Sequence, residues 1–276
     1  MKLTMKLRSL IFACSCLLSG IANADSFSLP IWKEKAEELG YNLPKPFGLN
    51  LSYMSMEQGI NVDSIALKGV QLGPIDLDEL PLEAGAGKQA TNVMTLRADV
   101  WLFPFLNLYG LVGTLDGYSE TTVKLKVSDH TLFETPFRLD LDGYTYGGGF
   151  VLAGGYKQLF ALVDASYTQT NLNVIDGAID AIVVSPRIGY DFNNHGIPLR
   201  FWIGAMYQNV EQELSGTLKQ AGIKGLPGRF EVKQQLTSEW NTIAGMQYQI
   251  NDDWYLLGEA GFGERQSIFF SLDRRF

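Results

Sequence analysis

The sequence predicts an all-β fold: an antiparallel up-and-down β-barrel of about ten strands that crosses a membrane. From residue 47 onward, apolar and polar residues alternate in segments of about ten residues, which is the period of a half-buried strand. The links between these segments are alternately short and long. The charged residues within the segments fall on one face. Together these three observations are typical of a transmembrane barrel with short turns at one end and longer loops at the other.

Residues 1–24 have the pattern of a secretory signal peptide. Three basic residues, Lys2, Lys6 and Arg8, precede an apolar stretch, and the small residues Ala22 and Ala24 flank Asn23 after it. We expect cleavage after Ala24. A lipoprotein signal ending at Cys14 is the alternative, and it is disfavoured because the bulky Phe12 occupies a position where such signals have a small residue.

Removal of this segment leaves a mature chain without cysteine, since Cys14 and Cys16 both lie inside it. The mature chain therefore has no disulfide and no thiolate for catalysis or metal binding. It keeps 19 basic residues against 30 acidic ones, a net charge of −11, which excludes nucleic acid as a natural partner. No mature segment approaches the roughly 20 consecutive apolar residues of a membrane helix.

Residues 25–46 form a separate periplasmic segment with a short amphipathic helix before the barrel. Trp32, Ala36 and Leu39 share one helical face, and Gly40 is a helix stop. Two placements remain open: the helix lies on the membrane surface, or it covers the periplasmic mouth of the barrel.

Residues 47–276 form the barrel. We expect ten strands, at 48–58, 92–102, 106–118, 143–155, 160–171, 180–192, 199–211, 239–250, 254–263 and 267–276. The long links are 59–91, 119–142 and 212–238, and two strand-like stretches in them, 122–127 and 229–233, are expected to extend the hairpins beyond the membrane. A further hairpin around residues 64–72 would make twelve strands, the main alternative.

Alternation assigns the charged residues of the strands to the lumen. A basic residue facing lipid near the midplane would cost about 2–4 kcal/mol. The predicted lumen network consists of Arg97, Asp99, Asp164, Arg187, Asp191, Arg200, Glu259, Asp273 and Arg275. These charges either form a selectivity lining or active site, or pair with one another to fill a narrow barrel. Ten strands lie nearer the size that side chains fill, which favours the second interpretation.

The aromatic residues next to the short links predict a girdle at the periplasmic interface. The set is Trp101, Phe103, Phe105, Tyr156, Phe160, Tyr190, Phe192, Phe201, Tyr248, Trp254 and Phe276.

The last strand carries Ile268, Phe270, Leu272 and Phe276 on one face, with Asp273 and Arg275 on the other. This tail resembles the closing strand of bacterial outer-membrane β-barrels, in which a terminal Phe and alternating apolar residues mark the chain for insertion. The resemblance implies an outer-membrane location, contact with outer-membrane lipid and lipopolysaccharide, and recognition by the outer-membrane assembly machinery. Arg274 departs from the pattern, because it falls on the apolar face, from which its long side chain can reach the interface.

Candidates for catalysis are few. His195 lies in a turn, and His130 lies in an outside loop with Asp140 and Asp142, where such groups could activate water. Ten-stranded outer-membrane proteases of the omptin type use such groups, but no stretch matches their motifs. Residues 76–79 lack the ligand spacing of a known calcium loop. We therefore expect no cofactor and no metal.

The sequence predicts a non-enzymatic, porin-like barrel for small-solute passage or for interaction through its outside loops. An outer-membrane hydrolase, a protease or lipid-modifying enzyme with its site at the extracellular mouth, is the alternative. The sequence does not predict the oligomeric state.

Overall fold

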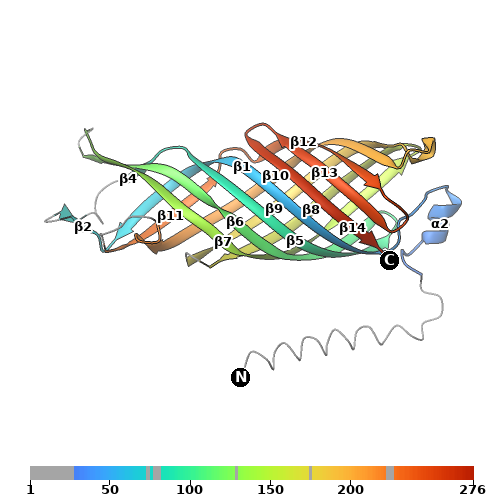
Figure 1. Ribbon diagram of the computed structural model, residues 1–276, viewed down its shortest axis with the longest axis horizontal. Helices are drawn as coiled ribbons and strands as arrows, with labels where there is room; N and C mark the ends of the chain where they lie inside the picture. The colour runs from blue at the N-terminus through green and yellow to red at the C-terminus, as the bar shows by residue number, and fades with distance from the viewer. Residues whose placement is uncertain (1–27, 73–74, 77–81, 128–129, 174–175, 222–226) are drawn as a thin grey trace, which may run out of the picture.

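The computed structural model describes residues 28–276 apart from 73–74, 77–81, 128–129, 174–175 and 222–226. The predicted signal peptide and its cleavage site lie outside the described residues. Figure 1 shows an elongated barrel with the helix α2 beside one end. The elements are α2 (Lys33–Glu38), β1 (Phe47–Lys68), β2 (Gln71–Leu72), β3 (Ile75–Asp76), β4 (Leu82–Ala84), β5 (Gly87–Phe103), β6 (Leu106–Val127), β7 (His130–Tyr156), β8 (Leu159–Leu172), β9 (Asp176–Asp191), the 3-10 turn η1 (Asn193–His195), β10 (Leu199–Thr217), β11 (Arg229–Leu236), β12 (Trp240–Gln249), β13 (Trp254–Phe262) and β14 (Arg265–Arg275).

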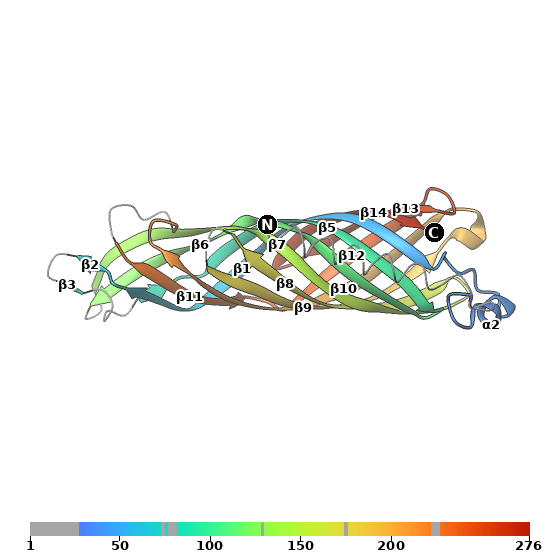
Figure 2. The same cartoon turned by 90° about the horizontal axis from the view of Figure 1, so that it is seen from below.

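The strands close into a ring, as the sequence predicts. β1 pairs with β14 along one edge and with β5 along the other, and every pairing in the ring is antiparallel. In the described part of the chain, ten strands run through the end that holds the short turns: β1, β5, β6, β7, β8, β9, β10, β12, β13 and β14. We call this the turn end and the opposite end the loop end. Figure 2 shows β2 and β3 at the loop end, away from α2.

The strands continue much further toward the loop end than the sequence indicates. β1 and β6 have 22 residues each and β7 has 27, although about ten suffice to cross a bilayer. The strand-like stretches at 122–127 and 229–233 lie in β6 and β11, so they extend the hairpins as expected. Residues 64–68 belong to β1 and no additional spanning hairpin is present among the described residues, so the twelve-strand alternative is not realised. The sheet does contain twelve strands, but β4 and β11 pair only near the loop end.

The number of strands in the ring decreases along the barrel. At the turn end, β1 pairs with β14 as far as the Gln58–Arg265 pair. Beyond it, β1 pairs with β11, beginning at Ile60 and Leu236, and β11 also pairs with β10. The hairpin of β13 and β14 ends at this level, so among the described residues the ring there consists of eight strands, β1 and β5 to β11. We call this eight-stranded part the distal barrel.

The outer surface changes character at the same level. On β10 the outward residues 199–207 are Leu199, Phe201, Ile203, Ala205 and Tyr207, and those that follow are Asn209, Glu211, Glu213, Ser215 and Thr217. The odd-numbered residues of β10 point outward along the whole strand, but these outward residues change from apolar to polar. Nine residues match the length of a tilted membrane strand. We call the apolar outer zone at the turn-end half the belt.

The outer surface of the distal barrel is charged and largely paired. Lys233 donates to Glu213 at 2.6 Å, and Lys68 pairs with Glu231 at 2.6 Å. The hydrogen bond to Glu213 raises the pKa of Lys233. Such a surface is suited to water rather than to lipid.

The N-terminal segment lies at the mouth of the turn end. The ring of Trp32 packs against Phe103 with centroids 5.0 Å apart, and the Ile31 amide donates to the Leu102 carbonyl at 2.9 Å. The Tyr41 hydroxyl donates to the Gly155 carbonyl at 3.0 Å on another turn. Of the two placements that the sequence leaves open, the structure therefore has the helix at the mouth. None of the described helices is long and apolar enough to cross a membrane.

Two aromatic residues assigned to the girdle face inward instead. Trp101 and Phe160 line the lumen, because each has the inward parity of its strand. Arg274 points outward as the sequence predicts, with its guanidinium 4.8 Å from the ring centre of Phe276 and 5.4 Å from that of Trp254. These cation–π contacts account for an arginine on an otherwise apolar face.

Candidate functional site

The barrel interior is the candidate site, and it has three successive levels. Charged side chains occupy the turn-end half, a layer of amide side chains follows, and apolar side chains fill the distal barrel. The levels arise from the inward residues of the same strands. On β10, for example, Arg200 and Trp202 are followed by Gln208 and Gln212 and then by Leu214.

Glu259 on β13 is the centre of the first charged group. Arg187 on β9 donates to both of its oxygens, from Nε at 2.7 Å and from Nη2 at 3.0 Å. The Trp202 indole donates to the same carboxylate at 2.6 Å. Glu259 is 7% exposed, so this two-point ion pair crosses the lumen in a largely desolvated setting, where charge-assisted bonds are strong.

A second group surrounds Asp99 on β5. Arg275 donates to it at 2.7 Å and Asn107 at 2.5 Å, and Arg275 also pairs with Asp273 at 3.0 Å. Arg97 approaches Asp99 at 4.0 Å.

Arg97 continues this group toward β8. It lies 3.6 Å from Asp164 and 3.7 Å over the ring of Tyr109, and the Tyr109 hydroxyl donates to Asp164 at 2.5 Å. The tail of the chain is thereby linked to β5, β6 and β8 through side chains inside the barrel.

The third group is the pair of Arg200 and Asp191, joined at 2.7 Å near the turn end. All nine residues of the predicted lumen network thus lie inside the barrel, each within ion-pair distance of another member. Asn107, Tyr109 and Trp202 also take part and were not predicted. The first two lie on the strand at 106–118, whose faces the sequence does not distinguish because apolar residues occur on both.

A cavity of about 1500 Å³ opens at the turn end between these groups and the N-terminal segment. Trp32 and Tyr41 lie at its mouth, and Arg187, Trp202 and Phe269 lie deeper among the residues that line it. The lining contains paired charges and aromatic rings.

The second level is a connected layer of polar side chains, four glutamines with a serine and an arginine, which we call the septum: Gln58, Gln89, Gln212, Gln234, Ser119 and Arg265. Gln58 donates to Gln89 at 3.1 Å, Gln212 donates to Gln89 at 3.2 Å, and Gln234 donates to Gln212 at 2.6 Å. Ser119 donates to Gln234 at 3.2 Å and Arg265 donates to Gln58 at 3.0 Å. The septum therefore joins β14, β1, β5, β10, β11 and β6 across the lumen.

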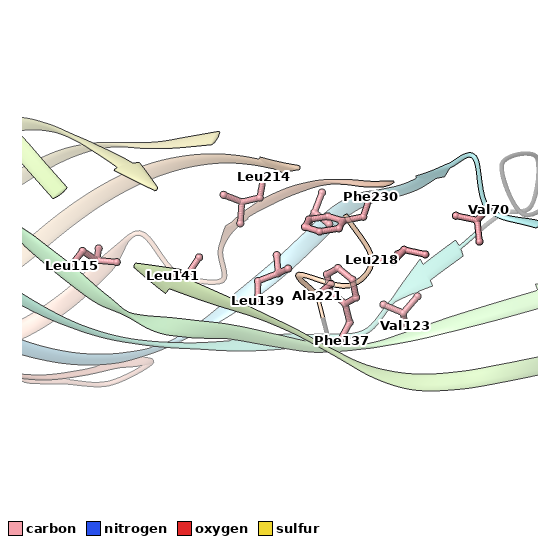
Figure 3. Close-up of a cluster of buried hydrophobic side chains, with 11 residues drawn as sticks. Val70, Leu115, Val123, Phe137, Leu139, Leu141, Leu214, Leu218, Ala221 and Phe230 are labelled. Carbon is pink, nitrogen blue, oxygen red and sulfur yellow. The ribbon is translucent and has the colours of Figure 1, made fainter. Parts of the chain in front are cut away.

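Apolar side chains fill the third level, as Figure 3 shows. The cluster consists of Val70, Leu115, Val123, Phe137, Leu139, Leu141, Leu214, Leu218, Ala221, Phe230 and Val232. On β6 it begins at Leu115, before Ser119 of the septum, so the two levels overlap on that strand. Phe137 and Phe230 meet edge to face with ring centroids 5.3 Å apart. Phe230 and Leu141 have 0% exposure and Leu214 has 1%. Side chains lining a water-filled channel would retain exposed area, so this level excludes water.

The remaining sequence candidates lie apart from these groups. Ile268, Phe270, Leu272 and Phe276 are exposed on the outer surface of the belt, and their role in membrane insertion stays a prediction. The His195 ring is 2.9 Å from the Tyr190 hydroxyl in a short turn. His130 is the first residue of β7.

Residues 77–79 of the 76–79 stretch considered for calcium binding lie outside the described residues. Within the described residues, no group of three or more His, Cys, Asp or Glu side chains is placed to hold a metal ion.

No protein-family model and no curated protein matches the chain. Among solved structures it is similar to the outer membrane protein OprG from Pseudomonas aeruginosa, with 9% identity over 85% of this chain and 99% of OprG and a TM-score of 0.40. The transport unit of the autotransporter AIDA-I from Escherichia coli has 9% identity, coverages of 84% and 90%, and a TM-score of 0.33. The toluene transporter TbuX from Ralstonia pickettii has 9% identity, coverages of 85% and 90%, and a TM-score of 0.30. OprG belongs to the class that the closing strand resembles. Because these TM-scores are low, the barrel assignment rests on the strand pairing of the chain itself.

Proposed function

We propose that this chain is an integral barrel of the bacterial outer membrane that carries a closed, apolar-cored distal barrel outside the cell. In this proposal it is not an enzyme, and it acts through interaction at its outer surface rather than as an open pore. One observation carries the proposal. Along the same strands, the apolar side chains lie outside the barrel in the turn-end half and inside it in the distal barrel, and the polar side chains do the opposite.

The belt supports the membrane part of this proposal. Its outward side chains are apolar over the length of a membrane strand, and the charges at that level lie inside the barrel. Aromatic side chains frame it, with the half-buried Tyr207 and the exposed Trp240 toward the loop end and the exposed Phe276 and Tyr248 toward the turn end. Aromatic girdles of this kind sit at the two membrane interfaces. Outer-membrane lipid, with lipopolysaccharide in the outer leaflet, is the partner we assign to this surface.

The distal barrel supports the functional part. Its polar exterior and water-free interior are those of a soluble β-barrel, which makes it a stiff projection rather than a set of loose loops. A solute moving along the lumen would meet the septum and then the apolar core. The side chains of both levels are buried, so neither level offers an open path. Passage would require both to rearrange.

Planar-bilayer recording tests this proposal directly. The mature protein, shown to be folded by heat-modifiable migration on gels, should produce no discrete conductance steps. A variant with Leu139, Leu214 and Phe230 changed to Ser should conduct or leak, because hydroxyl groups in the core admit water. A matched variant with Glu213 and Lys233 changed to Ser alters the outer face of β10 and β11 and should stay silent. Stepwise conductance by the unmodified protein would overturn the closed-barrel function and favour small-solute passage.

The hydrolase alternative is tested separately with a His130→Ala variant. We expect the unmodified protein to have no activity on peptide or lipopolysaccharide substrates. Activity that disappears in the His130→Ala variant would establish the enzyme instead.

A further inference from the structure

Arg265 is the one charged member of the septum, and the proposed closed barrel does not account for its charge. It begins β14 at the tip of the β13–β14 hairpin and points into the barrel, where it is 2% exposed. It has the same inward parity as Asp273 and Arg275, but it lies at the level of the septum rather than among the lumen charges.

The partners of Arg265 are neutral. Its Nε donates to the Gln58 amide oxygen at 3.0 Å and its Nη2 donates to the Ser238 carbonyl at 3.0 Å. No carboxylate of the described residues lies within ion-pair distance, and the buried Nη1 has no hydrogen-bond partner among them. The nine-residue lumen network, in contrast, gives each arginine an acidic partner. An arginine carries its charge at all ordinary pH values, and a desolvated charge without a counter-ion is strongly unfavourable.

Asn241 supplies a second observation at the same place. It is 5% exposed, it points inward from β12, and neither its Nδ2 nor its Oδ1 has a partner within the described residues. It packs against the hairpin tip, since a methyl group added at Gly263 would lie 3.1 Å from its Oδ1 and one added at Gly261 would lie 2.7 Å from its Nδ2. Gly263 is two residues before Arg265, and Ser238, which accepts from Arg265, is three residues before Asn241.

Ser267 completes the surroundings. A methyl group at Gly261 would also collide with the Ser267 hydroxyl, at 2.3 Å. Two glycines therefore bring the hairpin backbone close to Asn241 and Ser267, while Arg265 lies at the start of the same strand. The side chains supply N–H and O–H donors and one full positive charge, with no acid of the described residues among them.

We infer that Arg265, Asn241 and Ser267 form a binding site for a small inorganic anion such as chloride, at the tip of the β13–β14 hairpin inside the wall of the barrel. The anion supplies the missing counter-charge to Arg265 and accepts from Asn241. It thereby links the tip of the β13–β14 hairpin to β12 at the level where the ring passes from ten strands to eight. The unpartnered atoms, Arg265 Nη1 and the Nδ2 and Oδ1 of Asn241, are buried, which favours a small anion over a large one.

The test compares the thermal unfolding of the folded, detergent-solubilised protein in sodium chloride and in sodium gluconate at equal ionic strength. Chloride should raise the unfolding midpoint in a saturable way, by about 2–4 °C or more, because a ligand that binds only the folded state stabilises it by mass action. Gluconate is too large for the site and should not. Arg265→Gln should abolish the difference between the two salts and Asn241→Ala should reduce it. Lys233→Gln, which removes a positive charge from the outer surface, should leave the difference intact.

Crystals of the unmodified protein soaked in bromide provide a readout that needs no variant to fold. An anomalous peak between Arg265 and Asn241 is expected. Equal midpoints in chloride and gluconate, together with no bromide peak there, would overturn the site and leave the closed-barrel function untouched. Conductance by the unmodified protein would overturn that function without affecting the anion site.

Discussion

At the scale of single residues, the buried Glu259 group is an arrangement in which each charge depends on its partner. One carboxylate accepts from both Arg187 and Trp202. We predict that Glu259→Leu lowers the free energy of unfolding by about 3–5 kcal/mol, because it leaves Arg187 buried without its counter-ion. Adding Arg187→Leu should recover most of this loss, since no unpaired charge then remains. What persists should be the cost of the unpaired Trp202 indole, about 1–3 kcal/mol.

Urea titration of the protein refolded into lipid vesicles measures both variants. Glu213→Gln is the control, because it breaks an ion pair on the exposed surface of the distal barrel and should leave the titration unchanged. If the double variant were as unstable as Glu259→Leu alone, the pair would not be the source of the loss.

At the scale of a single strand, β10 passes through all three interior levels and through the change of the outer surface from apolar to polar. Ile203 is 65% exposed on the belt, and Glu211 lies on the same outward face further along. We predict that Ile203→Arg costs about 2–4 kcal/mol of folding free energy in lipid vesicles, because the charge faces hydrocarbon. Glu211→Arg should cost little, because that position faces water and lies opposite Asp180 on β9.

The same titration in vesicles measures this pair of variants. Equal losses at the two positions would mean that the belt does not mark the membrane. The comparison is matched, because strand, face and introduced residue are the same.

Strand alternation is also the reason why much of this fold could be predicted from the sequence. It gives the ten strands and the inward face of Arg97 or Arg187 without any knowledge of the neighbouring strands. It does not give the level at which a lumen closes, because that depends on which strands pair there. Arg265 shows the limit: in the sequence it lies in a three-residue link, and only the Gln58–Arg265 pairing makes it part of β14 and of the septum. The apolar core was missed for a related reason, since Leu139 lies in a stretch that the sequence assigns to a loop, and Phe230 lies in one that was expected only to extend a hairpin.

At the scale of the whole molecule, two kinds of barrel share one set of strands. The turn-end half is apolar outside and polar inside, and the distal barrel is the reverse. Ending the β13–β14 hairpin early reduces the ring from ten strands to eight, a size that side chains can fill. The cavity in the turn-end half is therefore closed toward the loop end by the distal barrel.

This arrangement predicts a definite pattern of chemical accessibility in whole cells. Single cysteines can be placed freely, because both native cysteines lie in the predicted signal peptide. A membrane-impermeant thiol reagent should label Lys233→Cys, on the outside of the distal barrel, in intact cells. It should label Asn194→Cys, at an exposed turn of the turn end, only after the outer membrane is permeabilised. Ile203→Cys should resist labelling in both cases while the protein remains folded, because lipid covers the belt. Labelling of Asn194→Cys in intact cells would reverse the assigned orientation, and labelling of Ile203→Cys in the folded protein would show that the belt faces water.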